Sequence, residues 1–162
     1  MMKSQEIQGN DHANVVVFPP LPFVLAVVVG VLAHVLWEPF RFFPEFWIGH
    51  AAGWPLVLAA AVLVVWAQRT MAGAGESSNV YKPNAAIVST GPFAFTRNPM
   101  YVSMTLLYAG IAFVFNTAWP AVLLPAVLML IQHGVIIQEE RYLESKFGDA
   151  YRQYRTRVRR WL

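Results

Sequence analysis

Four long apolar runs without Asp, Glu, Lys or Arg limit what this chain can fold into. Each run is about 20 residues long, the length that an α-helix needs to cross about 30 Å of hydrocarbon. Only 13% of all residues are charged, against about 25% in soluble domains. The sequence therefore predicts an all-α polytopic membrane protein with about four transmembrane helices. The runs are Phe18–Trp37, Trp47–Ala67, Pro99–Ala118 and Trp119–Ile137.

The 162 residues fit a single domain. In the last part of the chain, Tyr151, Tyr154 and Val158 recur at helical spacing among arginines, which predicts an amphipathic helix lying on the membrane surface. The last two apolar runs are joined by a very short connection, so we expect them to form an antiparallel hairpin. The expected parts are a polar tail over 1–17, transmembrane helices over 18–137 and a cytoplasmic C-terminal helix over 138–162.

The distribution of basic residues predicts the orientation in the membrane. Seven of the twelve Lys and Arg residues lie between Arg141 and Arg160. If both termini are cytoplasmic, eleven of the twelve fall on the cytoplasmic side and only Arg41 lies outside. The positive-inside rule favours this orientation. Basic residues beside a membrane helix are typical of contact with anionic lipid, so we expect the bilayer as partner and no nucleic acid.

The sequence contains no cysteine, which excludes disulfides and thiolate metal sites. Glu139 and Glu140 are adjacent carboxylates, but hard cations need six or more oxygen ligands and zinc favours His or Cys. His133 lies seven residues before Glu140, about two helical turns away and too far to share one ion. We therefore expect no metal site. His133 and Gln132, polar residues in an apolar run, are expected to face the bundle interior.

A second polar cluster, "GPFAFTRNPMY", lies at the start of the third apolar run. Asn98 before Pro99 is typical of a helix N-cap, and Tyr101 follows on the same face. The helix N-terminus and the charge of Arg97 together suit an anion such as a carboxylate. A capped helix with a snorkelling arginine explains Asn98 and Pro99 equally well.

Glu139 and Glu140 allow several interpretations from sequence alone. They could act as a general base, or accept hydrogen bonds from hydroxyls and an ammonium group. They could also mark a water-facing helix end, where Arg141 and Lys146 would neutralise them.

The order and spacing of these motifs resemble the isoprenylcysteine carboxyl methyltransferase and phospholipid methyltransferase group of integral-membrane enzymes. The similarity covers residues 83–162 and rests on "GPFAFTRNPMY", on Glu139–Glu140 and on "FGDAYRQYRTRVRRW". It implies S-adenosylmethionine as methyl donor and an amphiphilic or lipid-like acceptor. It also implies a catalytic Arg160 beside the acceptor. The residues expected to bind the donor are Arg97, Asn98, Pro99, Tyr101, Glu139, Glu140 and Tyr151.

Two other functions fit a small chain with four apolar runs. A small membrane transporter is expected to keep an acidic residue deep within a span for proton coupling, and none of the four runs contains Asp or Glu. A membrane assembly subunit without catalytic activity would not need the paired polar clusters. We therefore expect an integral-membrane methyltransferase.

Overall fold

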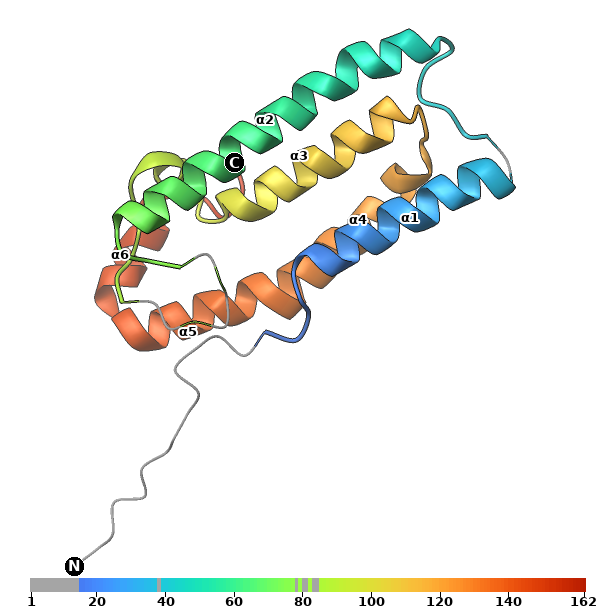
Figure 1. Ribbon diagram of the computed structural model, residues 1–162. Helices are drawn as coiled ribbons and strands as arrows, with labels where there is room; N and C mark the ends of the chain where they lie inside the picture. The colour runs from blue at the N-terminus through green and yellow to red at the C-terminus, as the bar shows by residue number, and fades with distance from the viewer. Residues whose placement is uncertain (1–14, 38, 78, 80–81, 83–84) are drawn as a thin grey trace, which may run out of the picture.

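The computed structural model is built from helices (Figure 1). Among the described residues the regular elements are all helical, and a single isolated bridge pairs Thr96 with Arg159. The predicted all-α class is therefore confirmed. The predicted polar tail over 1–17 lies mostly outside the described part of the chain. The structure describes residues 15–37, 39–77, 79, 82 and 85–162.

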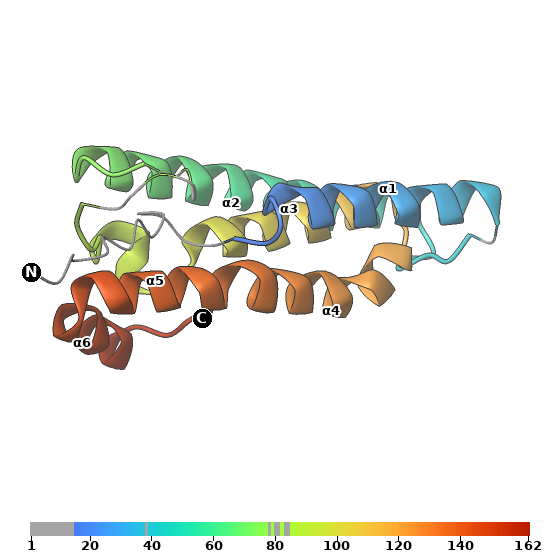
Figure 2. The same ribbon diagram turned by 90° about the horizontal axis from the view of Figure 1, so that it is seen from below.

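Each apolar run forms a helix, and the helices lie lengthwise beside one another (Figures 1 and 2). Proline at the first position of α1 and of α3 fits a helix start, because the missing N–H would have no partner there. The short turn between α3 and α4 makes them an antiparallel hairpin, as predicted. The helices are α1 (Pro20–Leu36), α2 (Phe46–Gly73), α3 (Pro99–Val114) and α4 (Trp119–Ile131).

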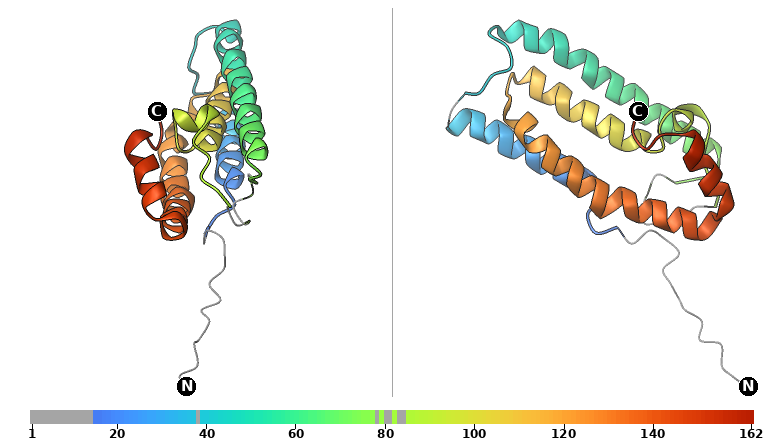
Figure 3. Two further views of the ribbon diagram at one scale, coloured as in Figure 1. Left: turned by 90° about the vertical axis from the view of Figure 1, so that its left-hand side faces the viewer. Right: turned by 180° about the vertical axis from the view of Figure 1, so that it is seen from behind.

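The helix that begins at Trp119 continues beyond Ile137, the predicted end of the last transmembrane helix. It passes through a π-helical turn, η2 (Gln132–Ile136), into α5 (Ile137–Phe147). The predicted single helix over 138–162 is therefore wrong. Gly148 has φ of +53°, a conformation that favours glycine, and it ends α5 before the short helix α6 (Asp149–Arg157). Figure 3 shows α6 folded back beside α5.

Two of these helices are long and apolar enough to cross a membrane: α2 and the continuous helix Trp119–Phe147. The other two are shorter, with 17 residues in α1 and 16 in α3. Large apolar side chains point outward along the bundle, among them Val28, Leu58 and Leu130. Soluble proteins rarely expose such continuous apolar surface, so the fold is that of a membrane protein.

Glycines bring α2 and α3 into close contact. A Cβ atom on Gly53 would lie 2.7 Å from the carbonyl oxygen of Gly110, and one on Gly49 would also meet the α3 backbone. Small residues at four-residue spacing are typical of packed membrane helices. On the other side of the bundle, Gly30 of α1 packs in the same way against Pro120 of α4.

Replacing Gly53 by leucine is expected to lower the free energy of unfolding by about 1–3 kcal/mol, because the larger side chain would push α2 away from α3. Thermal unfolding in detergent measures this loss. Gly73→Leu is the matched control, since a Cβ atom at Gly73 would meet nothing within 4 Å. Equal loss of stability in both variants would contradict the close packing described here.

Candidate active site

A cavity of about 590 Å³ lies where α2 ends and α3 begins. Side chains from α2, α3, α5 and α6 line it, together with the segment before α3 and the residues that start α1. Its volume lies within the range of small-molecule sites, about 300–1,000 Å³. Every residue that the sequence suggested for donor binding borders it: Arg97, Asn98, Pro99, Tyr101, Glu139, Glu140 and Tyr151.

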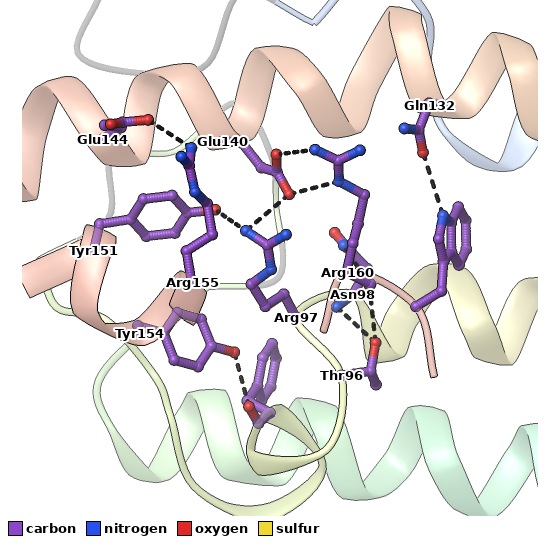
Figure 4. Close-up of polar contacts among 12 residues, drawn as sticks. Thr96, Arg97, Asn98, Gln132, Glu140, Glu144, Tyr151, Tyr154, Arg155 and Arg160 are labelled. Carbon is purple, nitrogen blue, oxygen red and sulfur yellow. Dashed lines mark hydrogen bonds and ion pairs between the residues drawn. The ribbon is translucent and has the colours of Figure 1, made fainter. Parts of the chain in front are cut away.

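Glu140 of α5 is the centre of an ion-pair cluster (Figure 4). Arg160 binds it with two hydrogen bonds, from Nε to Oε1 at 2.9 Å and from Nη2 to Oε2 at 2.7 Å. Nη1 of Arg97 lies 3.2 Å from Oε1. The side chain of Glu140 is 11% exposed and that of Arg97 is 8% exposed, so both charges are largely removed from water. Two arginines and one carboxylate leave a net charge of +1.

Arg97 has hydrogen-bonding capacity that these contacts do not use. Its Nη1 also donates to the Tyr151 hydroxyl at 3.4 Å. Its Nε–H is buried and has no partner among the described residues. Leaving a buried donor unpaired costs about 1–3 kcal/mol, so the arginine would gain from an additional acceptor. Because Arg97 borders the cavity, a bound anion could supply that acceptor.

Glu139 has a different environment from its neighbour Glu140. The Tyr101 hydroxyl donates to Oε2 of Glu139 at 2.9 Å, which joins α3 to α5. The alternative in which Arg141 and Lys146 neutralise the two carboxylates is wrong for Glu140. The cations that pair with Glu140 come from 43 residues before it and 20 residues after it.

The apolar face of α6 packs against the protein. Tyr151, Tyr154 and Val158 are buried, so the predicted amphipathic face is confirmed. The neighbours of this face are Ile87, Leu143 and Phe147. The face therefore contacts other side chains of the protein, whereas we expected it to contact the membrane surface.

The two tyrosines of α6 present hydroxyls to the site. Tyr154 donates to the Phe93 carbonyl at 2.8 Å. Burial, and next the nearby charge of Glu140, raise the pKa of the Tyr151 hydroxyl to about 12. Burial also raises the pKa of Tyr154. Both hydroxyls therefore remain protonated at neutral pH and act as hydrogen-bonding groups.

Asn98 occupies the position before α3 but does not cap the helix with its side chain. Its Nδ2 donates instead to the carbonyl of Arg160 at 2.8 Å. The predicted capping role is therefore wrong, because the side-chain amide is hydrogen-bonded to the backbone of Arg160 instead of to the first turn of α3. Pro99 begins α3, as the sequence predicted.

The two polar residues of η2 have different surroundings. Oε1 of Gln132 accepts a hydrogen bond from the Trp161 indole at 3.2 Å, so this side chain faces the protein as predicted. His133 is exposed on the outer side of the helix. The expectation that His133 faces the bundle interior is wrong.

Sequence reasoning missed Glu76, which follows α2 and is buried. Its Oε1 accepts hydrogen bonds from the backbone N–H groups of Ala85, at 2.8 Å, and Ala86. These contacts hold the chain where Ala86 and Ile87 line the cavity. The only signal in the sequence was a lone acid within an otherwise uncharged stretch, which does not identify its partner.

Comparisons with known proteins identify the family. The chain is 46% identical over 65 residues to an uncharacterized protein of Haemophilus influenzae, a match of 39% of this chain and 100% of that protein. It is 35% identical over 72 residues to the protein-S-isoprenylcysteine O-methyltransferase of Schizosaccharomyces pombe, which covers 44% of this chain but only 30% of that enzyme. No solved structure matches. Residues 48–150 match the family model for phospholipid methyltransferase, and the chain therefore belongs to the phospholipid methyltransferase family.

Proposed function

We propose that this protein is an integral-membrane methyltransferase that uses S-adenosylmethionine and methylates an amphiphilic or lipid-like acceptor. One observation carries the proposal: a single cavity gathers all seven candidate donor-binding residues in a chain of the phospholipid methyltransferase family. The name of the S. pombe relative, a protein-S-isoprenylcysteine O-methyltransferase, is consistent with an apolar acceptor.

The chemistry of the cavity fits the methyl donor. A carboxylate needs hydrogen-bond donors, and Arg97 has an unused Nε–H beside the positive end of α3. An ammonium group and ribose hydroxyls need acceptors. Glu139 is bound by one phenol, whereas both oxygens of Glu140 already contact arginine. We therefore assign the ammonium or ribose contact to Glu139 and the fixing of Arg97 to Glu140.

When bound, S-adenosylmethionine supplies an electrophilic methyl group on a sulfonium. The residues of this chain then have to orient the two reactants and exclude water. Tyr151 and Tyr154 close the cavity on the α6 side. Apolar side chains such as Val64, Met71 and Met104 extend its lining and would contact the apolar part of the acceptor.

We further propose four membrane spans with both termini and the segment between α2 and α3 in the cytoplasm. The distribution of basic residues supports this topology. A reporter fused after Leu162 is expected to read as cytoplasmic, and one inserted beside Arg41 as external. A periplasmic or extracellular signal from the fusion after Leu162 would reject the topology.

The function is tested with purified protein in lipid nanodiscs, a methyl-labelled donor and total membrane extract. We expect a labelled product that partitions into organic solvent and that mass spectrometry can identify. Calorimetry with S-adenosylhomocysteine tests donor binding separately. Absence of both binding and labelled product would reject the proposed function.

We propose that Arg160 orients the acceptor. Arg160→Ala is expected to lower turnover by about 10–100-fold, the effect of losing one charge-assisted contact, while donor affinity stays nearly unchanged. Arg160→Lys should restore only part of the activity, because lysine lacks the planar fork that holds Arg160 on Glu140 with two hydrogen bonds. The control is Arg159→Ala, whose exposed side chain should matter little. Equal losses in a side-by-side assay of the Arg159 and Arg160 variants would contradict this role.

A further inference from the structure

Residues 158–162, called the tail segment here, are hydrogen-bonded to the segment that precedes α3. The backbone N–H of Arg97 donates to the Arg159 carbonyl at 2.9 Å. The next carbonyl, that of Arg160, accepts from Asn98 Nδ2 at 2.8 Å and from Thr96 Oγ1 at 3.1 Å. These three bonds fix the backbone of the tail segment beside the residues that precede α3, of which Arg97 and Asn98 border the cavity.

The tail segment also contacts the continuous helix formed by η2 and α5. The Arg160 guanidinium binds Glu140, and the Trp161 indole N–H donates to Gln132 at 3.2 Å. The Trp161 ring packs against the apolar cluster that contains Ile131 and Val135. Gln132 is thus a polar side chain in an apolar helix whose amide oxygen is bound by the indole of the tail segment.

We propose that Gln132 and Trp161 are positioning residues for methyl transfer, and this inference rests on the proposed function. Their hydrogen bond docks the tail segment and thereby fixes the Arg160 backbone on both sides. With the backbone fixed, the guanidinium reaches Glu140 without losing as much conformational freedom as a free arginine would.

Electrostatics explain why docking is needed. Arg97 and Arg160 carry like charges and share one carboxylate, so they repel each other. The Arg160 side chain is 33% exposed, whereas that of Arg97 is 8% exposed. Of the two, Arg160 can therefore leave Glu140 for water more easily. The Gln132–Trp161 bond opposes that departure and keeps the +1 cluster assembled.

Three variants in nanodiscs test the proposal: Gln132→Leu, Trp161→Phe, which keeps an aromatic ring but removes the indole N–H, and Gln132→Glu, which keeps an acceptor. The control is His133→Leu, at the neighbouring exposed residue of the same helix. The first readout is tryptic cleavage after Arg159, which reports release of the tail segment and needs no activity. The second is turnover, with the Michaelis constant for the donor measured in parallel.

We expect Gln132→Leu and Trp161→Phe each to raise the cleavage rate by about 3–10-fold, the effect of one lost hydrogen bond. Turnover should fall by a similar factor with little change in the Michaelis constant for the donor. A variant that combines Gln132→Leu with Trp161→Phe should resemble either single variant. Gln132→Glu should restore protection of the tail segment from cleavage. His133→Leu should resemble the wild type.

Two results would overturn the inference. Unchanged cleavage in Gln132→Leu and Trp161→Phe would show that the pair does not dock the tail segment. Faster cleavage with unchanged turnover would show that docking does not position the reactive groups. A wild type that neither binds S-adenosylhomocysteine nor forms labelled product, but whose tail segment is protected and is released in Gln132→Leu, would instead reject the proposed function and support docking.

Discussion

Glu140→Ala is expected to lower the free energy of unfolding by about 3–5 kcal/mol. The substitution would leave Arg97 and Arg160 facing each other without the carboxylate that both bind. The unpaired charge of Arg97 would destabilise the protein more than that of Arg160, because the Arg97 side chain is largely buried. Thermal or denaturant unfolding in nanodiscs measures the loss, and we expect methyl transfer to disappear together with the cluster.

Glu144→Ala is the matched control for this prediction. Glu144 lies one turn further along α5 and also pairs with two arginines, Arg152 and Arg155. These pairs are exposed to solvent, and exposed ion pairs contribute only about 0–1 kcal/mol. A similar loss of stability in the Glu140 and Glu144 variants would show that burial does not distinguish the two clusters.

Glu140 also illustrates what the sequence could and could not predict. Apolar runs of about 20 residues predicted the helices, because the length and composition of a helix are local properties. The partners of Glu140 are not local: one precedes it by 43 residues and the other follows it by 20. No pattern in the sequence says which arginines reach a given carboxylate. The family resemblance predicted that these residues lie at one site, but it did not predict that they form one ion-pair cluster.

The last part of the chain shows a second limit. The spacing of Tyr151, Tyr154 and Val158 predicted an apolar helix face, and that face is buried. Periodicity does not distinguish a face that contacts lipid from one that contacts protein, so the sequence could not show that this face packs against Ile87, Leu143 and Phe147. Gly148 was visible in the sequence, but only its positive φ shows that it separates two helices.

The π-helical turn escaped prediction for a related reason. A π turn changes which faces of a helix are aligned before and after it, and the polar residues Gln132 and His133 of η2 do not by themselves identify such a turn. Gln132 was identified as polar, but its partner Trp161 lies 29 residues away. Pairing between a helix and a distant extended segment has no periodic signature in sequence.

Arg97→Ala is expected to weaken binding of S-adenosylhomocysteine by about 1–3 kcal/mol, or about 5–150-fold, while lowering stability little. Glu140 would keep its two hydrogen bonds from Arg160, so no carboxylate is left unpaired. The substitution thus removes the net positive charge of the cluster but leaves a neutral ion pair. Stability and donor binding should respond differently, in contrast to the Glu140 variant.

Calorimetry and thermal unfolding on the same nanodisc samples separate these two effects. Arg155→Ala is the control, because Arg155 is an exposed arginine on α6 that pairs with Glu144. It should leave affinity for S-adenosylhomocysteine unchanged. Wild-type affinity in Arg97→Ala would reject the assignment of Arg97 to the donor carboxylate. A large loss of stability in that variant would mean that Arg160 alone does not neutralise Glu140, and that the cluster depends on both arginines for folding.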